Sequence, residues 1–294
     1  MKDSKMQLEQ IEHVDAIEAN HFKESYVKAL IPLVVRNLSK DWPASKKWSL
    51  DYFAQEVGEV EVPLYNSEPA KGKESSRTTA ARMLMKDYVT LLKKGPTDLR
   101  IFFFNILQKA PELMGDFKYP DLGIKFFKKL PVLFFGGAGS KVLLHYDMDF
   151  ANNLHFNFVG EKEVFLFPHD QKAFLYHVPH SIVSMESIEF DNPDYDKFPA
   201  LKYAKGFKVL LKPGDMLYIP SGYWHYIRYK TPSVSLTLRS FPSSSVKRLK
   251  FLKSILFTMH FDNIMRKLRG QNWIDYKNKI AVETAEKAMR GRYN

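Results

Sequence analysis

The alternation of hydrophobic and polar residues predicts a series of short strands through the middle of the chain. Residues 60–65 and 234–239 alternate with a period of two, which is typical of strands with one buried face. Residues 100–105 and 216–219 are continuous apolar runs that suit strands buried on both faces. Two further strand-like runs lie at 31–35 and 131–135. Together these segments predict a mainly β protein.

Helical patterns lie on both flanks of this strand-rich region. Residues 1–30, which begin with polar residues, and residues 110–130, in pieces, are predicted to be helical. Ser49 is placed to cap a short helix over 50–57, and an amphipathic helix over 83–94 ends before Gly95-Pro96. The stretch 67–81 is rich in small, polar and charged residues, so we expect a solvated loop there or, alternatively, a mobile lid over a substrate groove.

After residue 242 the pattern changes from strand to helix. Apolar residues then recur near a spacing of 3.6, with Lys and Arg between them: Val246, Leu249, Leu252, Leu256, Met259, Ile264 and Leu268. A second helix is predicted from Asn272, its expected N-cap, to Met289. The chain therefore divides into N-terminal helices and strands (1–130), a β core (131–242) and a helical C-terminal segment (243–294).

The composition fits a folded globular protein and restricts the chemistry that it can perform. Hydrophobic residues make up 45% of the chain and aromatic residues 14%. The absence of cysteine excludes disulfides, thiolate zinc sites and cysteine nucleophiles, so any metal must be held by His, Asp or Glu. The N-terminal residues lack the apolar stretch of a targeting signal, and no apolar run approaches the length of a membrane span. We therefore expect a cytoplasmic protein without a membrane partner.

The formal net charge of +11 is concentrated near the C-terminus. From Val246 onward there are 12 Lys/Arg and 4 Asp/Glu. A basic segment of this kind can bind nucleic acid or other acidic partners. Here, however, the basic residues alternate with the apolar stripe, which suits packing or dimerisation better than an extended track along a phosphate backbone. We therefore expect an interaction between protein chains and no nucleic-acid partner.

Two histidines and one aspartate form a candidate metal site. In a strand, residues i and i+2 lie on the same face, so His145 and Asp147 can bind one ion. Alone, such a pair also fits a hydrogen-bonded surface pair. A third ligand is available 80 residues later at His225, which follows a Pro-Gly-Asp turn and a short apolar strand. Two histidines and a carboxylate make the facial triad that suits non-haem Fe(II).

The residues around this triad resemble a known family. Gly214, followed by Pro220-x-Gly222 and His225, resembles the second cupin motif. The stretch 142–241 is similar to the JmjC and cupin-like 2-oxoglutarate oxygenases, and within them to the asparaginyl hydroxylase branch that inhibits hypoxia-inducible factor. The resemblance is carried in order by the following motifs: His145-Tyr146-Asp147, Gly160-x-Lys162, Leu166-Phe167-Pro168, Phe190-Asp191-Asn192-Pro193-Asp194-Tyr195, Phe198-Pro199 and Pro213-Gly214-Asp215-x-Leu217-Tyr218-Ile219-Pro220.

The resemblance implies a fold, a reaction and a set of cofactor-binding residues. It implies a double-stranded β-helix (jelly-roll or cupin) core with flanking helices. It also implies an Fe(II)- and 2-oxoglutarate-dependent dioxygenase (hydroxylase), with His145, Asp147 and His225 as catalytic metal ligands. Lys162 matches the family lysine that binds the far carboxylate of 2-oxoglutarate, and Asn153 matches the asparagine near that cosubstrate. By the same likeness the substrate is a protein or peptide side chain, although a small molecule is possible, and the C-terminal helices form a homodimer.

Three positions depart from the family pattern and leave alternatives open. Val142 and Phe102 stand where family members carry hydroxyl groups that contact the cosubstrate. Arg239 stands at a family asparagine, and its guanidinium could bind the carboxylate in their place, or it could face solvent. The alternatives to the oxygenase are a cupin-fold metalloprotein that does not use 2-oxoglutarate and a non-catalytic binding module with a vestigial triad.

The other acidic and histidine residues near the motif are expected to lie outside the metal site. His-x-Asp geometry favours Asp147 over Asp149 as the ligand. We expect His155 to point at neighbouring strands rather than at the metal. His169, His177 and His180 lie in polar loops and are expected to be solvated.

Overall fold

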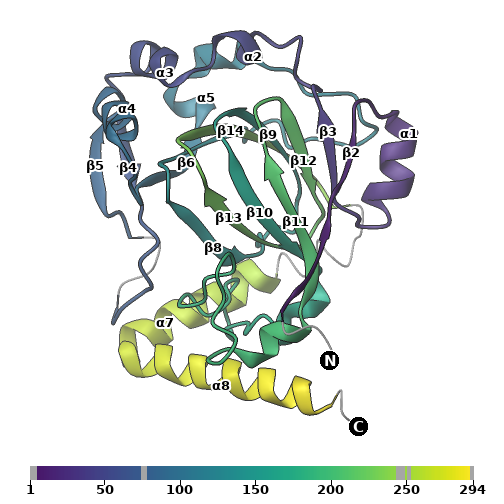
Figure 1. Cartoon of the computed structure of the whole chain (residues 1–294). Coiled ribbons are helices and arrows are strands. Elements are labelled where there is room, and N and C mark those ends of the chain that lie inside the picture. Colours follow the sequence, from purple (N-terminus) through teal and green to yellow (C-terminus); the bar gives the residue numbers. More distant parts are fainter. Residues whose placement is uncertain (1–4, 74–77, 243–248, 250–252, 292–294) are drawn as a thin grey trace.

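Two facing β-sheets form a barrel, which helices cover at its ends and on one side (Figure 1). The structure is a computed structural model that describes residues 5–73, 78–242, 249 and 253–291. The mainly β fold with a cupin-like core and flanking helices that the sequence predicts is confirmed. The proposed borders at residues 130 and 242 stay predictions.

The larger sheet has seven strands. Their order across the sheet is β2-β3-β12-β9-β14-β7-β6. They are β2 (Glu12–Val14), β3 (Leu33–Arg36), β12 (Asp215–Ile219), β9 (Asn152–Val159), β14 (Ser233–Ser240), β7 (Val132–Gly136) and β6 (Arg100–Asn105). All neighbours are antiparallel except β2 and β3. The predicted strands at 31–35, 100–105, 131–135, 216–219 and 234–239 are therefore all present, with small shifts at their ends.

The smaller sheet has five strands and provides the opposite wall of the barrel. Its order is β1-β11-β10-β13-β8. The strands are β1 (Gln7–Gln10), β11 (Lys205–Leu211), β10 (Lys162–Phe167), β13 (Trp224–Tyr229) and β8 (Lys141–His145). Strand β6 is the last in the larger sheet and β8 is the last in the smaller one. We call the junction between these two strands the seam.

An apolar cluster fills one part of the space between the sheets. Along β10 and β13, side chains alternate between the two faces, as the strand period requires. Val164 and Leu166 of β10 and Ile227 and Tyr229 of β13 belong to this interior cluster. The intervening Phe165 packs with a second cluster on the outer face of the small sheet. Lys162 is fully buried two residues before Val164, so it lies on the inner face of the barrel.

The N-terminal segment joins both sheets. Strand β1 pairs in parallel with β11 of the smaller sheet, and β2 pairs in parallel with β3 of the larger one. Only Ile11 separates them, and it is buried in the interior cluster. The prediction of helix over residues 1–30 is therefore wrong for 7–14 and right for α1 (Ala19–His21) and the π-helical segment Phe22–Val27. The distant sheet edges, which local sequence does not reveal, decide the conformation of residues 7–14.

A small helical layer covers the outer face of the larger sheet. It contains α2 (Pro43–Lys47), α3 (Leu50–Glu56), α4 (Met85–Lys94) and the hairpin of β4 (Glu61–Leu64) with β5 (Ala81–Leu84). The Ser49 side chain accepts a hydrogen bond from the Tyr52 backbone N–H at 3.1 Å, which confirms the predicted cap. Helix α4 begins two residues later than predicted because residues 81–84 pair with β4.

The prediction of helical pieces over 110–130 is mostly wrong. Only α5 (Ile106–Lys109), just before it, and a 3₁₀ turn over Pro111–Asp116 are helical. Beyond the turn the chain runs irregularly to β7, and Phe117 and Leu122 are buried against the core. Pro120 and Gly123 interrupt the run, and the apolar residues pack without regular backbone hydrogen bonds.

The C-terminal helices lie across one end of the barrel (Figure 1). A π-helical segment, Ser254–Met259, leads into α7 (His260–Arg269) and then α8 (Gln271–Arg290). The predicted N-cap at Asn272 is wrong, because α8 begins at Gln271 and Gly270 occupies the cap with a positive φ of 51°. Residues 243–248 and 250–252, where the predicted stripe begins with Val246 and Leu252, lie outside the described residues.

A buried charge cluster fixes α7 to α8. Asp262 of α7 accepts hydrogen bonds from the Lys277 ammonium at 2.5 Å and the Trp273 indole at 2.9 Å. Arg266 binds the other carboxylate oxygen at 3.2 Å. Although burial raises the pKa of Asp262, these donors together hold it below its usual value. Each charge in the cluster therefore has a partner of opposite sign.

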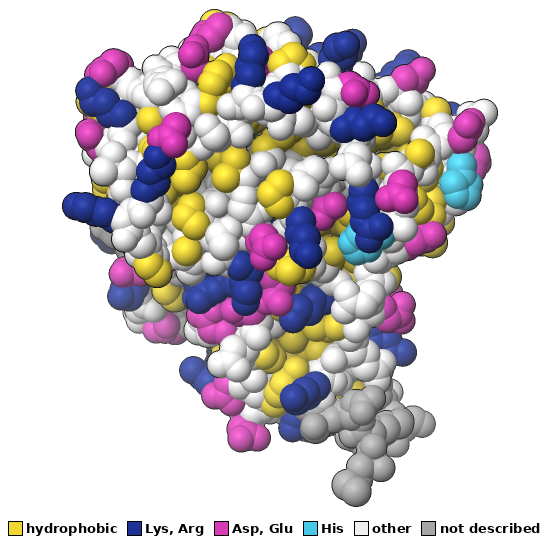
Figure 2. All heavy atoms as spheres, turned by 45° about the horizontal axis from the view of Figure 1, so that its top comes forward, with side chains coloured by type: hydrophobic (Ala, Val, Ile, Leu, Met, Phe, Trp, Pro, Cys, Tyr) yellow, Lys and Arg dark blue, Asp and Glu magenta, His cyan; other side chains and the backbone are white. Residues whose placement is uncertain are grey.

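The surface does not present the excess positive charge as one patch on the face shown in Figure 2, where Lys and Arg side chains are interspersed with Asp and Glu. Within the described parts of the chain, no helix is both long enough and apolar enough to cross a membrane.

Candidate metal centre and its cavity

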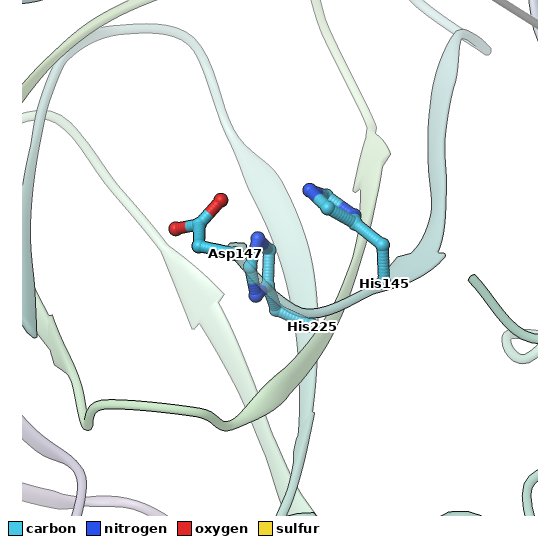
Figure 3. A group of neighbouring side chains, drawn as sticks. All are labelled: His145, Asp147 and His225. Atoms are coloured by element: carbon cyan, nitrogen blue, oxygen red, sulfur yellow. The ribbon is translucent and has the colours of Figure 1, made fainter. Parts of the chain in front are cut away.

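The structure brings His145, Asp147 and His225 together at one end of the barrel interior (Figure 3). His145 ends β8, and the register of the β8–β13 pair sets it directly opposite His225. Asp147 follows two residues after β8 ends. One ligand atom from each residue lies within 4.8 Å of the others, and the two imidazole centroids are 4.1 Å apart. This spacing fits three ligands around one ion.

Backbone carbonyls orient both imidazoles. The Nδ1 atoms of His145 and His225 lie 2.9 Å from the Leu143 carbonyl oxygen and 3.2 Å from the Tyr223 carbonyl oxygen. A carbonyl only accepts, so these contacts place the ring protons on Nδ1 and leave Nε2 as the donor atom for a metal. Hydrogen bonds of this type fix the tautomer and orientation of metal-binding histidines.

Asp147 is held as a carboxylate. Its Oδ2 accepts a hydrogen bond from the Asn153 amide at 2.6 Å and lies 3.1 Å from the Arg239 guanidinium. Burial opposes ionisation, but chiefly the positive charge of Arg239, together with the hydrogen bond from Asn153, holds the pKa of Asp147 well below its usual value. Asp149 lies outside this group of three and binds Arg239 at 2.7 Å. The choice of Asp147 as the metal ligand stays a prediction.

Arg239 lies beside the triad. Its side chain is 16% exposed, so of the two alternatives left open by the sequence, the one in which Arg239 faces solvent is wrong. It comes from β14, directly opposite Asn153 of β9. Because it bridges Asp147 and Asp149, its first role in the structure is to position the metal-site carboxylate.

His155 lines the same cavity and points at the neighbouring strand β14, as predicted. Its Nδ1 lies 2.8 Å from the Thr237 hydroxyl and its Nε2 lies 3.4 Å from the Lys162 ammonium. Burial, with the nearby charge of Lys162, holds the pKa of His155 well below its usual value. Its place on the cavity wall also has a signal in the sequence: if Asn153 faces the interior of the barrel, its i+2 neighbour must do so as well.

Lys162 is completely buried. Its ammonium donates to the Ser235 hydroxyl and lies 4.8 Å from the centre of the Tyr229 ring. Burial holds the pKa of Lys162 well below its usual value. In the part of the chain that the structure describes, Lys162 forms no salt bridge. A lysine in this position is poised to gain a negatively charged partner.

A cavity of about 450 Å³ lies at the triad, and its volume is in the size range of small-molecule sites. Lys162 lies behind its wall, against the lining residue Tyr229. The triad, Asn153, His155 and Arg239 line one part of the cavity. Its other walls are mainly apolar and include Val142, Phe102, Phe134 and Ile227. Arg100 of β6 also lines the cavity, and no motif in the sequence marks it as a site residue.

Two of the three loop histidines are not solvated. His177 is half-buried against the rings of Trp224 and Tyr146. Burial lowers the pKa of His177 to about 4. His169 lies 3.1 Å from the Gly222 carbonyl oxygen and packs on Trp224. Only His180 is exposed, as predicted. The polar sequence of this loop gives no sign of these contacts, because Gly222 and Trp224 lie about 50 residues later in the chain.

Residues 19–246 match the model of the cupin-like domain family, and the chain therefore belongs to that family. The predicted membership of the JmjC and cupin-like group is confirmed. The narrower likeness to asparaginyl hydroxylases stays a prediction.

The individual relatives differ in the activities that their names give. The chain is 29% identical to lysine-specific demethylase 8 of Xenopus tropicalis over 76% of its own length and 51% of that protein. It is 26% identical to tRNA wybutosine-synthesizing protein 5 of Gallus gallus, over 78% and 76% of the two chains. It is 24% identical to HSPB1-associated protein 1 of Homo sapiens, over 97% of its own length and 62% of that protein. The chain thus spans about half the length of the demethylase that it matches.

Proposed function

We propose that the protein is an Fe(II)- and 2-oxoglutarate-dependent oxygenase that hydroxylates a side chain of a protein substrate. The observation that carries the proposal is the convergence of two histidines and one ionised carboxylate at one cavity. Behind the wall of this cavity, against the Tyr229 ring, lies a buried lysine, Lys162, without a salt bridge among the described residues. Family membership supports the same reaction class.

The donor set fits a divalent transition metal. His145, Asp147 and His225 would hold Fe(II) and leave its remaining positions for other ligands, as facial triads do. Bound together, Fe(II) and 2-oxoglutarate supply oxidation by O2, which yields succinate, CO2 and a hydroxylated substrate. The chain itself orients the imidazoles through Leu143 and Tyr223 and keeps Asp147 ionised through Asn153 and Arg239.

The cosubstrate would be bound mainly through its distal carboxylate. Lys162 is the proposed cation for that group, because its burial without a counter-charge is relieved when a carboxylate arrives. Asn153 is proposed to lie next to the cosubstrate, since it lines the cavity beside Asp147. Arg239 is proposed to contact the cosubstrate as well, while it keeps its salt bridges to Asp147 and Asp149.

One rival is favoured by a specific observation. Val142 and Phe102 bring apolar surface to the cavity wall where hydroxyl groups would help to bind a carboxylate. That wall would suit a cupin metalloprotein that does not use 2-oxoglutarate. The non-catalytic binding module has no such support in the structure, because the triad is complete and oriented.

Anaerobic titration of the Fe(II)-loaded protein with 2-oxoglutarate tests the proposal. A saturable visible charge-transfer band is expected, absent in His145→Ala and shifted to higher cosubstrate concentration in Lys162→Ala. Arg228→Gln is the matched control, because Arg228 lies on the same strand as His225 but pairs with Asp191 at 3.5 Å. Bound iron without any band in the wild-type protein would favour the rival metalloprotein.

A protein substrate is supported by the surroundings of the cavity. Met148 and Ile182 line both this cavity and a second one of about 280 Å³, which lies against α7 and α8. An extended peptide could occupy both, with one side chain at the metal site. Succinate release that rises on addition of a peptide, together with one added oxygen atom in that peptide, would support this substrate class over a small molecule.

We also propose a homodimer formed through the C-terminal helices. Phe261, Ile264 and Leu268 lie on one side of α7 and are 44%, 55% and 74% exposed, and Phe257 just before them is 69% exposed. An apolar patch of this kind commonly marks an interface. Phe257→Asp with Leu268→Asp should convert a dimer to a monomer in light scattering, while a monomeric wild-type protein would refute the dimer. The prediction that the protein is cytoplasmic is not tested by these observations.

A further inference from the structure

Arg100 is a second buried cation at the cavity, and the mechanism described so far does not use it. It is the first residue of β6 and is only 6% exposed. It lines both the main cavity and a smaller crevice of about 60 Å³ at the seam, together with Phe102, Val142 and His145. Its side chain therefore lies where the apolar wall of the cavity meets the triad.

The backbone of Arg100 is hydrogen-bonded, whereas two nitrogen atoms of its guanidinium have no hydrogen-bond partner among the described residues. Its backbone N–H and C=O exchange hydrogen bonds with Tyr65, both at 2.9 Å. The guanidinium Nε and Nη1 atoms are buried and have no hydrogen-bond partner among the described residues. Asp98 is close enough to act on its charge, but the Asp98 oxygens already accept hydrogen bonds from the Ser67 backbone N–H and hydroxyl. Buried donors are rarely left without partners in this way.

Tyr229 connects Arg100 to Lys162. Gly136 lies directly opposite Arg100 in the β6–β7 pair, and a Cβ atom at Gly136 would come within 2.5 Å of the Tyr229 ring. The glycine thus lets the ring lie against β7 beside Arg100. The Lys162 ammonium is 4.8 Å from the centre of that same ring. The two unpaired cations therefore border one aromatic side chain on the wall of one cavity.

Burial without compensation is unfavourable for both cations. Burial lowers the pKa of Arg100 from its usual value, although guanidinium stays charged in proteins. An isolated buried charge is costly unless a counter-ion or several hydrogen bonds offset it. A carboxylate is the natural partner, because a guanidinium offers donors in a planar arrangement that matches its two oxygens.

We propose that Arg100 is a cosubstrate-binding residue that, with Lys162, binds the distal carboxylate of 2-oxoglutarate; this inference rests on the proposed oxygenase function. It assigns to Arg100 the role that the sequence suggested for Arg239. Arg239 pairs with Asp147 and Asp149 at 3.1 and 2.7 Å, and only its Nε is buried without a partner among the described residues. Arg100 has no carboxylate hydrogen bond there, and both its Nε and its Nη1 are buried without a partner. The guanidinium then replaces the hydroxyl donors that Val142 and Phe102 cannot provide.

A comparison of two 2-oxo acids tests the role of Arg100. 2-Oxoglutarate and 2-oxopentanoate have the same metal-chelating end and the same chain length, but only the first carries a distal carboxylate. Each is titrated anaerobically into Fe(II)-loaded wild-type, Arg100→Gln, Arg100→Lys and Arg228→Gln proteins, and the charge-transfer band gives the Kd. The same proteins without cosubstrate are melted to compare their stability.

Arg100→Gln should raise the Kd of 2-oxoglutarate at least about 30-fold, consistent with loss of a charge-assisted hydrogen bond. The Kd of 2-oxopentanoate should stay within about twofold of the wild-type value, because this ligand has nothing for Arg100 to bind. Arg100→Lys should recover part of the affinity for 2-oxoglutarate only, and Arg228→Gln should resemble wild type for both acids.

Two results would overturn the inference and leave the oxygenase proposal intact. In the first, Arg100→Gln binds 2-oxoglutarate as tightly as wild type. In the second, it weakens both acids equally, which would make Arg100 a structural residue of the seam. If the wild-type protein itself gives no band with 2-oxoglutarate, the proposed function fails together with the inference, so the two failures are distinguishable. Should Arg100→Gln unfold, Arg100→Met and Arg100→Lys allow the same comparison.

Discussion

Lys162 in the barrel and Lys277 in the C-terminal helices are buried to nearly the same extent but in opposite electrostatic settings. They are 0% and 2% exposed, and burial lowers the pKa of both. Lys277 binds Asp262, which Arg266 and Trp273 also contact. Lys162 has a hydroxyl, an imidazole and an aromatic ring around it, and no carboxylate partner among the described residues.

The difference separates charges that hold the fold together from charges that await a ligand. In the helical cluster, the carboxylate and its donors are complete within the chain, so the cluster stabilises the packing of α7 on α8. In the barrel, Arg100 lines the cavity and Lys162 lies behind its wall at the Tyr229 ring, and neither has a carboxylate partner among the described residues. A buried cation without a counter-charge lowers the stability of the ligand-free protein and increases its affinity for an anion.

The largest expected effect is on the paired lysine. Lys277→Met should lower the free energy of unfolding by about 3–5 kcal/mol, because it leaves Asp262 buried without its closest cation. Chemical denaturation followed by circular dichroism would measure the loss. The double variant Lys277→Met with Asp262→Leu should recover most of the lost stability, because the carboxylate that Lys277 neutralised is then removed as well. A single variant as stable as wild type would contradict the comparison.

The same substitution at the unpaired lysine should act on binding instead. Lys162→Met should weaken 2-oxoglutarate about 100-fold, or about 2.7 kcal/mol, by removing the carboxylate's cation. The ligand-free protein should unfold no more easily than wild type and should gain about 1 kcal/mol or more, because a buried uncompensated charge is gone. Isothermal titration and denaturation on one preparation would show both changes; a clear loss of stability would mean that Lys162 is a structural residue.

Asp116 tests whether pairing, rather than location, makes a buried charge stabilising. This residue lies beside the barrel and accepts hydrogen bonds from Lys47 at 2.9 Å, the Trp48 indole at 3.0 Å and the Tyr52 hydroxyl at 2.9 Å. Asp116→Asn should lower the free energy of unfolding by about 1–3 kcal/mol, since an amide cannot accept from all three donors. Chemical denaturation should show this loss of stability, and a titration of the folded variant should show an unchanged affinity for 2-oxoglutarate.

The smallest effect is a dependence on pH. The pKa of Lys162 is lowered in the folded protein, so the unfolded chain binds a proton more readily and stability rises as pH rises toward 10.5. The stability advantage of Lys162→Met over wild type should therefore shrink as pH rises from the lowered folded-state pKa of Lys162 toward 10.5. Over this range the buried lysine is already neutral, and the unfolded chain loses the same proton near pH 10.5. An advantage that is constant over this range would show that the buried lysine carries no electrostatic penalty.

How far the sequence predicts the site depends on whether a residue's neighbours are local. His145 and Asp147 could be paired because strand geometry fixes i and i+2, and Lys162 because family likeness located it. His155 could have been found by the same alternation from Asn153. Arg100 could not, because its significance depends on Gly136 and Tyr229 from two other strands and on the absence of a nearby acceptor among described residues.

The fold shows the same division. Strands and helices with clear periodicity or a cap, such as α3 after Ser49, were predicted closely. Residues 7–14 and 117–130 were not, because sheet edges and core contacts far along the chain determine their conformation. The orientation of Arg239 likewise became apparent only when Asp149 was placed in space.

The two short strands on either side of Ile11 impose an order on assembly. Their partners begin at Leu33 for β2 and only at Lys205 for β1, so a ribosome has made some two hundred residues before β1 can pair. During synthesis β1 therefore has no partner strand until β11 has been made, and an unpaired strand edge is a template for intermolecular pairing. Strand β1 thus emerges long before its partner, and once it is paired, β1 and β2 each form the edge strand of one sheet.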